Sequence, residues 1–381
     1  MKDMNPQFFR ALGMISGTSI DGIDTALIET DGHSHVRPLA FMPHSYDFVF
    51  RTRLRACFGN RKGTLDPEIA VFEQELTELH ASLVQQFLHE HNLSADEIDF
   101  IGFHGQTIWH KPEERVTIQI GDGELLAELT GIPVVNDFRS ADVKAGGHGA
   151  PLVPLYHRAL AAQLPKPVAI INIGGVSNIT WIAGEGEDEI MAFDMGPGNA
   201  LIDDWVLRHT GHPYDEYGDL AAYGKVDEWL IEGFLKHPFF KEKPPKSLDR
   251  EAFHHLIPEN LSVADGAATL TMMTVRAIVE GLNLTPFRPQ NIYLTGGGRH
   301  NETMMRWISE LSRLTVGSVD DLGWSGDGLE AEAFAYLAVR SRLGLPLSVP
   351  STTGVLYPMT GGIFHNVIRK NQPAKASCTG R

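Results

Sequence analysis

The residues best suited to chemistry lie in four glycine-rich segments, and the first of these is 13–24. It reads G-M-I-S-G-T-S-I-D-G-I-D and carries hydroxyl and carboxyl groups at Ser16, Thr18, Ser19, Asp21 and Asp24. Hydroxyls and backbone amides bind phosphate oxygens, while a carboxylate beside them suits Mg²⁺ or a sugar hydroxyl. The segment has neither a G-x-G-x-x-G nor a Walker pattern, which excludes a simple Rossmann or P-loop site. An ordinary β-hairpin turn explains the Asp-Gly pair equally well.

The other three segments have the same character. They read N-I-G-G at 172–175, F-D-M-G-P-G-N at 193–199 and T-G-G-G-R-H-N at 295–301. Each is preceded by an apolar run typical of a strand, and glycines after strands let a ligand approach the backbone closely. A structural strand–helix turn rarely needs three consecutive glycines. We therefore expect the segment 295–301 to border an adenosine or a phosphate.

Asp194 is the carboxylate of these segments that could act in catalysis. The pattern predicts that it ends a strand and faces Gly196 and Gly198, where a phosphate and its acceptor would meet. The alternative is that Asp194 caps a helix beginning near Asn199. Because Asn199 is the simpler cap, the sequence favours a functional role for Asp194.

Strands and helices must position these segments, and apolar periodicity predicts where they lie. In the first half we expect a helix at 65–90, a shorter helix near 124–129, and strands at 8–14, 25–29, 36–42, 100–103, 117–120 and 134–135. A loop bearing His104, Gly105 and Gln106 is expected after the strand at 100–103. In the second half we expect strands at 168–173, 179–182, 190–193, 291–295 and 315–318, and helices at 199–209, 261–282, 302–314 and 328–343. Each half opens with three strands and continues with strand–helix alternation, which predicts a duplicated α/β organisation with a cleft between two lobes.

Composition limits the function classes. The chain has 381 residues, a length that predicts two domains. Its apolar and charged contents are average for soluble globular proteins. Its 32 basic and 48 acidic residues give a net charge of −16, which argues against nucleic-acid and anionic-membrane binding. The two cysteines, Cys57 and Cys378, fit a reducing compartment. With no long apolar segment, the sequence predicts a cytoplasmic protein that does not enter a membrane.

Seven motifs together resemble the anhydro-N-acetylmuramic acid kinase family over residues 12–365. They are the first segment, H-G-Q-T at 104–107, D-F-R-S-A-D at 137–142, G-G-H-G-A-P-L-V-P at 146–154, N-I-G-G-V-S-N-I-T at 172–180, F-D-M-G-P-G-N at 193–199 and G-G-G-R-H-N at 296–301. Seven motifs in one order are far more specific than a single glycine loop. The resemblance implies the α/β class and a two-lobed, actin-like ATPase (ribonuclease H-like) fold with an interlobe active-site cleft.

The resemblance also implies a reaction and a domain division. ATP, water and 1,6-anhydro-N-acetylmuramic acid would give ADP and N-acetylmuramic acid 6-phosphate, in the recycling of cell-wall peptidoglycan. The expected first lobe is 1–140 plus 340–371, the second lobe is 141–339, and 372–381 is a frayed tail. ATP and Mg²⁺ are the expected cofactors, with no permanent metal site. The expected assembly is a homodimer.

Functional residues follow from the matching motif positions. Asp194 resembles the family's catalytic base. The ATP and phosphate side would comprise Gly17, Thr18, Ser19, Ile20, Asp21, Gly22, Ile23, Asp24, Asn172, Gly174, Gly175, Gly196, Gly198, Asn199, Gly296, Gly297, Gly298 and Asn301. The sugar side would comprise His104, Gln106, Asp137, Arg139, Asp142 and Glu330.

Two of these assignments have structural alternatives. Arg139 either pairs with the lactyl carboxylate of the sugar or bridges Asp137 and Asp142. Glu330 resembles an acceptor for a sugar hydroxyl, and it would also suit the N-terminus of a helix electrostatically. The proline-rich segment 241–247 is interpreted as a surface loop that could approach the cleft on closure.

Three other functions compete with this reading. The first is another sugar or metabolite kinase of the same superfamily. The second is an actin- or chaperone-like ATPase whose output is conformational, although the chain leaves no room for a peptide-binding region after Ala338. The third is a nicotinamide dehydrogenase, which would require a glycine fingerprint that this chain lacks.

Overall fold

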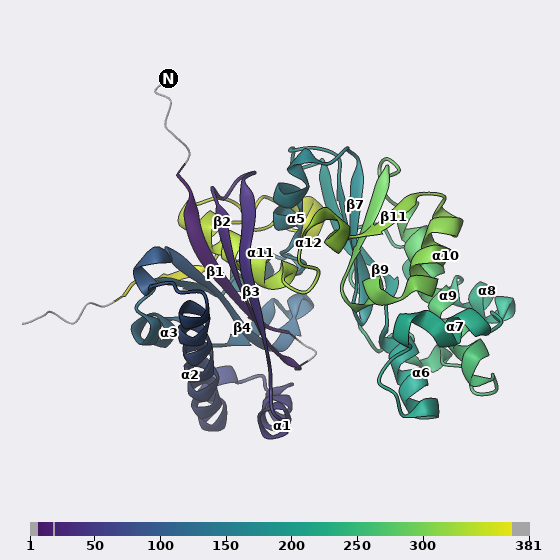
Figure 1. Cartoon of the computed structure of the whole chain (residues 1–381), viewed down its shortest axis with the longest axis horizontal. Coiled ribbons are helices and arrows are strands. Elements are labelled where there is room, and N and C mark those ends of the chain that lie inside the picture. Colours follow the sequence, from purple (N-terminus) through teal and green to yellow (C-terminus); the bar gives the residue numbers. More distant parts are fainter. Residues whose placement is uncertain (1–6, 18–19, 368–381) are drawn as a thin grey trace, which may run out of the picture.

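The computed structural model describes residues 7–17 and 20–367, which form two α/β lobes lying side by side (Figure 1). Each lobe is built on its own sheet, with seven strands in the first and five in the second. Thr18, Ser19 and the tail expected at 372–381 lie outside the described residues.

The first sheet has the order β12-β6-β4-β1-β2-β3, with β5 paired to β4. Its strands are β1 (Phe9–Ser16), β2 (Gly22–Thr30), β3 (Val36–Ser45), β4 (Phe100–Lys111), β5 (Val116–Ile120), β6 (Val134–Asn136) and β12 (Ile363–His365). The accompanying helices are α1 (Phe48–Cys57), α2 (Pro67–Glu90), α3 (Gly123–Thr130) and α4 (Ser140–Lys144). The strands and the two helices expected in this half are confirmed, with bounds that shift by several residues.

The long helix α2 illustrates why these elements form. Asp66 caps its N-terminus by accepting a hydrogen bond from the Glu68 amide, and Pro67 occupies the first turn, where its missing N–H costs nothing. Apolar residues then recur every three or four positions and are buried, among them Ile69, Phe72 and Leu76. They join one core with Leu12 and Met14 of β1. The helix therefore covers one face of the first sheet.

The second sheet has the order β11-β10-β7-β8-β9. Its strands are β7 (Val168–Ile173), β8 (Val176–Ile182), β9 (Ile190–Pro197), β10 (Asn291–Thr295) and β11 (Thr315–Ser318). The helices of this region are α5 (Pro154–Leu160), α6 (Ala200–Thr210), α7 (Asp219–Tyr223), α8 (Glu228–Phe234), α9 (Val263–Leu282) and α10 (Glu302–Ser312). Trp181 of β8, Trp205 of α6 and Met273 of α9 belong to the large core between sheet and helices. The predicted duplication of α/β organisation is confirmed.

Both sheets repeat one topology. In each, three consecutive antiparallel strands (β1-β2-β3 and β7-β8-β9) are extended by two parallel strands on the side of the first (β4 and β6, β10 and β11). This is the strand arrangement of ribonuclease H-like folds, and its occurrence in two adjacent lobes is the predicted two-lobed architecture. Corresponding hairpins, β1–β2 and β7–β8, therefore occupy matching positions.

A late helix completes the first lobe. Helix α11 (Leu329–Arg342) packs on β1, β2 and β4, although it follows the second sheet in sequence. It comes so close that a Cβ on Gly13 would lie 1.8 Å from the Ala331 carbonyl oxygen, and one on Gly102 would lie 2.0 Å from that of Phe334. The lobe division at 140 and 340 stays a prediction. Most of α11, which that division gives to the second lobe, lies on the first sheet. After α11 come only α12 (Pro350–Thr353) and β12 among the described elements.

Two strands are longer than predicted. The expected loop at His104 to Gln106 is wrong, because β4 continues to Lys111 by pairing with β5. Asp194 does not end a strand either, because β9 continues to Pro197 by pairing with β8. Both polar segments are therefore held in rigid sheet backbone.

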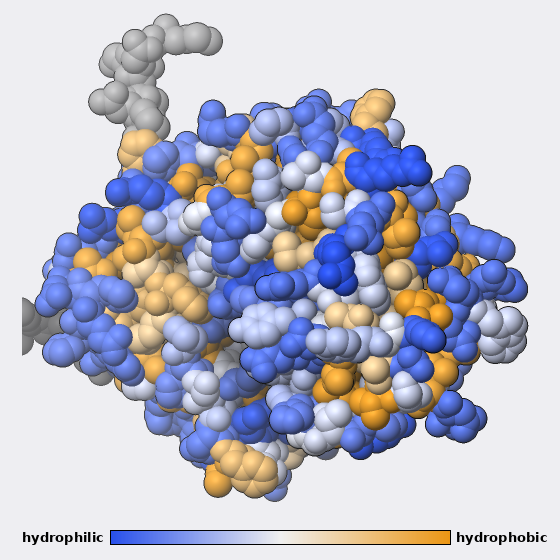
Figure 2. Space-filling model, turned by 45° about the vertical axis from the view of Figure 1, so that its right-hand side comes forward, coloured by the Kyte–Doolittle hydropathy of each residue, from blue (hydrophilic) through white to orange (hydrophobic). Residues whose placement is uncertain are grey.

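Figure 2 shows apolar residues in separate groups among hydrophilic ones on the visible side. No helix among the described residues is long and apolar enough to cross a bilayer.

Candidate active site

A cleft of about 430 Å³ lies between the two sheets. Its wall on the first-lobe side includes Asp21, Asp24 and Glu330, and its wall on the second-lobe side includes Asn172 and Gly296. Four of the seven motifs thus contribute residues to the lining of this cavity, namely those at 13–24, 146–154, 172–180 and 296–301. The remaining lining residues are Phe41, Pro43, Pro151, Val153, His157, Asn178, Thr180, Thr295, Gly326, Asp327 and Leu329.

The first-lobe wall is acidic. Burial, followed by the neighbouring charges of Asp21, Glu330 and Asp327, raises the pKa of Asp24 to about 7. Burial also raises the pKa of Glu330, although the charge of Arg139 opposes this shift. Like charges held together are stabilised by protons or by a bound cation. The β1–β2 hairpin, where Ser16 pairs with Ile23, carries this charge at its tip.

The second-lobe wall is neutral and rich in backbone groups. The amides of Gly198 and Asn199 donate to the carbonyl oxygens of Gly175 and Gly174, at 3.0 Å and 2.7 Å. Gly296 has φ +72°, and a Cβ there would lie 2.3 Å from Asn172 Oδ1. These contacts bring three of the predicted glycine segments together at one end of the sheet.

A second cavity of about 400 Å³ adjoins these segments. It is lined by the predicted residues Asn199, Gly297 and Asn301, and by Ile202, Asp203, Tyr214, Asp215, Glu216, Tyr217 and His300. Burial, followed by the charges of Asp204 and Asp215, raises the pKa of Asp203 to about 7 despite the opposing charge of Arg250. The cavity combines two tyrosine rings with carboxyl and amide groups, which suits a flat heterocycle bearing polar edges.

Asp194 lies within β9, opposite Asn178 of β8. Its Oδ2 accepts a hydrogen bond of 2.7 Å from the Leu248 amide, and its own amide donates to the Lys246 carbonyl oxygen at 3.0 Å. Burial raises the pKa of Asp194 to about 6, while the Leu248 hydrogen bond and the charge of Lys246 oppose the shift. Asp194 is not a helix cap. The N-cap of α6 is Asn199, whose Nδ2 donates to the Ile173 carbonyl oxygen instead of capping with its side chain.

The buried His104 pairs with the half-buried Arg139. Arg139 Nε donates to His104 Nε2 at 2.9 Å, and Arg139 Nη1 donates to the Gly149 carbonyl oxygen at 2.7 Å. Because Nε2 accepts, Nδ1 carries the proton and donates to the Gly105 carbonyl oxygen at 2.9 Å. Burial and the charge of Arg139 hold the pKa of His104 well below its usual range. Burial lowers the pKa of Arg139 to about 10. The imidazole is therefore neutral.

The acidic partners expected for Arg139 lie elsewhere. Asp142 is buried and accepts hydrogen bonds from the Gly149 amide, Ser348 Oγ and Thr353 Oγ1. Asp137, at φ +50°, accepts from the Ser140 amide. Among the residues with described positions, no ion pair joins Arg139 to either carboxylate. The proposed bridge between Asp137 and Asp142 is therefore wrong.

The predicted sugar-side residues do not all meet in the main cleft. His104 and Asp137 line a separate hollow of about 230 Å³ with Thr117, Ile118, Gln119, Gly121, Asn136 and Ser140. Gln106 is buried, where its Oε1 accepts from Ser16 Oγ at 2.5 Å, and Tyr46 donates to the same Ser16 oxygen at 2.7 Å. Glu330 alone of the six lines the main cleft. His104 and Asp137 line the separate hollow, whereas Gln106, Arg139 and Asp142 line neither space.

Several residues at the site were not predicted. Asn178 and Thr180 line the cleft from β8, and His157 of α5 is hydrogen bonded to Thr180 Oγ1 through Nδ1, at 2.9 Å. Burial lowers the pKa of His157 to about 3, so it is neutral. Asn178 and Thr180 do belong to the N-I-G-G-V-S-N-I-T motif, which was the available signal.

The proline-rich segment was also misread in part. Lys246 is buried, and Arg250 lies beside the β7–β8 hairpin, where its Cδ would be 3.6 Å from a Cβ on Gly175. The interpretation of 241–247 as a surface loop is wrong at Lys246. Nothing in the local sequence indicates that this segment reaches Asp194.

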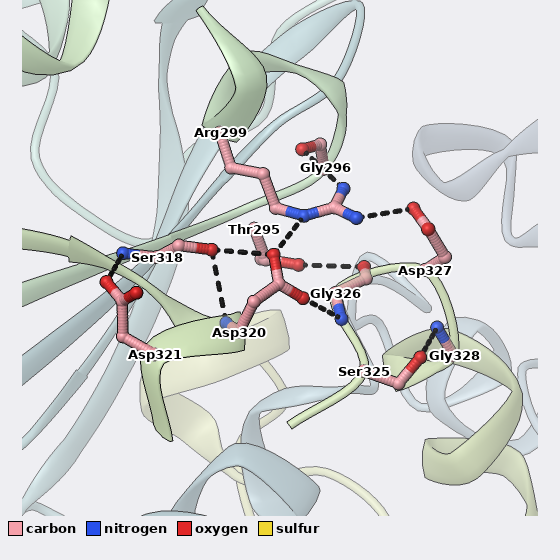
Figure 3. Close-up of polar contacts among 10 residues, drawn as sticks. All are labelled: Thr295, Gly296, Arg299, Ser318, Asp320, Asp321, Ser325, Gly326, Asp327 and Gly328. Atoms are coloured by element: carbon pink, nitrogen blue, oxygen red, sulfur yellow. Dashed lines mark hydrogen bonds and ion pairs between the residues drawn. The ribbon is translucent and has the colours of Figure 1, made fainter. Parts of the chain in front are cut away.

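A buried arginine, Arg299, joins the loop at 296–298 to the segment that leads into α11 (Figure 3). The Arg299 side chain is 4% exposed, and it forms ion pairs of 2.8 Å with Asp320 and 2.9 Å with Asp327. Its Nη1 donates to the Gly296 carbonyl oxygen, and Asp320 Oδ1 accepts from the Gly326 amide. The loop at 296–298 and the segment leading into α11 are thus fixed to each other.

Comparison with known proteins gives a consistent picture. A family model described as anhydro-N-acetylmuramic acid kinase matches residues 9–366. The chain is 50% identical over 359 residues to the anhydro-N-acetylmuramic acid kinase of Rhizorhabdus wittichii, covering 93% of this chain and 98% of that one. It is 46% identical over 366 residues to the one of Zymomonas mobilis, covering 94% and 100%. Among solved structures, a ROK hexokinase from Thermus thermophilus matches with a TM-score of 0.41 at 16% identity, covering 87% of this chain and 99% of that one.

Proposed function

The chain belongs to the anhydro-N-acetylmuramic acid kinase family, and we propose that its interlobe cleft is where ATP meets 1,6-anhydro-N-acetylmuramic acid. As a member of this family it is a phosphotransferase that uses ATP on a small anhydro amino sugar, in peptidoglycan recycling. The observation that supports the location is that one cavity is lined by Asp21 and Asp24 of the β1–β2 hairpin and by Asn172 and Gly296 of the second lobe.

We assign the general base to Asp194. Water adds to the anomeric carbon and gives its proton to the Asp194 carboxylate, while the bond from that carbon to O6 breaks. O6 then forms its bond to the γ-phosphorus as the bond to the β,γ-bridging oxygen breaks, and ADP leaves. The pKa of about 6 leaves Asp194 mostly ionised at neutral pH and close enough to it for efficient proton transfer. Its Oδ2 already accepts from Leu248, so Oδ1 is the oxygen assigned to the water.

The nucleotide is assigned to the second lobe. The phosphates would lie against Gly174 and Gly175, with the Arg250 guanidinium beside them, because backbone amides and a cation suit phosphate oxygens. The adenine and ribose would occupy the adjoining cavity lined by Gly297 and Asn301. Catalysis on this side consists of positioning and charge neutralisation.

Mg²⁺ fits the acidic hairpin only together with ATP. Asp21 and Asp24 are oxygen ligands of the kind that Mg²⁺ prefers, and burial, followed by the charges of Asp21, Glu330 and Asp327, raises the pKa of Asp24 to about 7. Within the described residues, no three His, Cys, Asp or Glu side chains converge as a metal site. A bound Mg²⁺ would thus take its other ligands from phosphate oxygens and water, and would neutralise charge developing on the transferred phosphoryl group.

The test is phosphorus NMR of purified protein with ATP and 1,6-anhydro-N-acetylmuramic acid, with and without Mg²⁺. We expect a sugar 6-phosphate and ADP in equal amounts, and no product in a chelator. Phosphorylation of a different sugar in preference would favour another sugar kinase of the superfamily. ATP hydrolysis that continues without any sugar would favour a conformational ATPase.

We further propose that the enzyme works in the cytoplasm as a homodimer, as the family resemblance implies. Light scattering of the purified protein would give twice the mass of the 42.0 kDa chain. A monomer at micromolar concentration would contradict the dimer. Cell fractionation tests the compartment.

A further inference from the structure

Residues 244–248 cross the edge of the second sheet beside Asp194, and we call them the strap. The strap contacts Asp194 at two points: the Lys246 carbonyl oxygen accepts from the Asp194 amide at 3.0 Å, and the Leu248 amide donates to Asp194 Oδ2 at 2.7 Å. These two bonds fix both the backbone and one carboxylate oxygen of Asp194. The orientation of the other oxygen therefore depends on where the strap lies.

The strap is held in place by the side chain of Lys246. This lysine is 6% exposed, although a charged side chain is almost never buried unless it is paired. Its Nζ donates to the Phe239 carbonyl oxygen at 2.8 Å and lies 3.9 Å from the centre of the Phe239 ring. A charge-assisted hydrogen bond and a cation–π contact thus replace the water that the ammonium would otherwise bind.

We propose that Lys246 is a positioning residue for the phosphoryl-transfer reaction, whose buried ammonium anchors the strap and thereby keeps the Asp194 carboxylate aimed at the reacting water. The inference rests on the proposed function, because it takes Asp194 as the base. It adds to that function a residue that acts through Asp194 without contacting the substrate.

The charges around Asp194 leave this role to Lys246. The neighbouring strand β8 and helix α12 carry no acidic or basic side chain. Helix α5 contributes His157, which is bonded to Thr180, and Arg158, which is bonded to the Glu185 and Gly186 carbonyl oxygens. Helix α9 contributes Asp265, Arg276 and Glu280. Of all charged side chains the structure describes, Lys246 is the one whose charge lowers the pKa of Asp194.

The positive charge of Lys246 shifts the acidic limb of the pH–activity profile to lower pH. Removing it would raise the pKa of Asp194, so that a larger share of the enzyme is protonated and inactive at mildly acidic pH. The attraction is mutual, since Asp194 also favours the charged form of Lys246, together with Glu242, against the effect of burial. At alkaline pH Asp194 is ionised with or without the lysine.

The experiment is the pH dependence of kcat for the full-length protein carrying Lys246→Gln, with Lys246→Arg as the matched control that keeps the charge. Gln can still donate to the Phe239 carbonyl oxygen. We expect the midpoint of the acidic limb to be about one pH unit higher in Lys246→Gln than in the wild type. Turnover at pH values below that midpoint should then be about tenfold lower. At pH 9 kcat should be near the wild-type value, and the KM for ATP should not change. Lys246→Arg should keep the wild-type limb.

Several outcomes would overturn the inference. An unmoved limb in a Lys246→Gln protein that melts at the wild-type temperature would do so, and so would an equal loss of kcat at every pH. If Lys246→Gln does not fold, Lys246→Met provides the same test with a side chain of similar length. Asp194→Asn separates this failure from that of the proposed function. Wild-type turnover in Asp194→Asn would remove the base itself, whereas an inactive Asp194→Asn beside an unmoved Lys246→Gln would remove only the role of Lys246.

Discussion

The two lobes share a topology but surround a half-buried carboxylate with neighbouring charges of opposite sign. Asp24 lies on the second strand of the first sheet, and its surroundings add negative charge from Asp21, Glu330 and Asp327. Asp194 lies on the third strand of the second sheet, and its surroundings offset burial with the Leu248 amide and the charge of Lys246. Burial is the main cause in both lobes and raises the pKa of Asp24 to about 7 and that of Asp194 to about 6, while the neighbouring groups act in opposite directions.

The difference matches the two functions proposed for these carboxylates. The second lobe supplies its own compensation, which suits a base that must be ionised before the substrate arrives. The first lobe leaves its negative charge for a ligand to neutralise, which suits a site that waits for a cation brought by the nucleotide. A duplicated fold can thus place a catalytic group on one hairpin and a cation-dependent binding group on the other.

The largest expected effect is on turnover, from Asp194→Asn. The amide keeps the size and the hydrogen bond but cannot accept the proton from water, so we expect kcat to fall by about 10²–10⁴-fold. Affinity for ATP should change little, because the assigned phosphate contacts are backbone amides and Arg250. Steady-state kinetics and nucleotide titration on one preparation check both expectations. Retained turnover would place the base elsewhere.

A smaller effect is expected from Asp21→Asn on the first hairpin. If the two lobes divide the work as proposed, this change weakens binding of MgATP by about 10–100-fold, the usual range for loss of a charged interaction. Titration of a slowly hydrolysed ATP analogue with Mg²⁺ measures it, and Asp96→Asn on an exposed turn serves as the control. A variant that binds MgATP normally but loses only turnover would erase the contrast between the lobes.

Asp24→Asn should change stability with a definite pH dependence. The folded-state pKa of about 7 exceeds the unfolded value of about 3.9, so the folded chain binds more protons between these limits. Stability contributed by the protonated carboxyl is thus lost as the pH rises through 7. Without ligand, we expect Asp24→Asn to melt at a higher temperature than the wild type at pH 8, and the gain to shrink at pH 5. Calorimetry at both values tests this, and an equal gain at both would refute the charge explanation.

The smallest expected effect is in overall shape. Assigned binding groups lie on both lobes, so ATP and sugar together should draw the lobes closer by a hinge. Small-angle scattering should give a smaller radius of gyration with both ligands than without them. Identical profiles would mean that the cleft is already in its working form.

Local patterns predicted the fold well where the partners of an element lie close in sequence. The strands at 291–295 and 315–318 were predicted to the residue, because short apolar runs there are bounded by turn residues. The predicted end of β4 came too early because a glycine at 105 is typical of a turn. In the structure Gly105 has φ +66°, but pairing with β5 continues the strand past it. The helices α7 and α8 were missed because their stability comes from packing on α9.

The motifs of the candidate site were predictable from the sequence, but the contacts that hold their side chains in place were not. Gly174, Gly198 and Gly296 do meet, and each was recognisable from its own segment. The support of Asp194 comes from Lys246 and Leu248, about fifty residues further along, and no local pattern encodes such a contact. The same is true of Arg139, whose partner His104 belongs to another motif.

The position of α11 has a consequence for how the chain folds during synthesis. The helix that covers β1, β2 and β4 begins at Leu329, so it leaves the ribosome after every strand of the second sheet. Until then, the part of the first sheet around Gly13 and Gly102 lacks the helix that packs on it most closely, although α5 already contributes Leu155 and Tyr156 to the core beside it. The first lobe to be made is therefore the last to be finished, and the second lobe can complete its own core first.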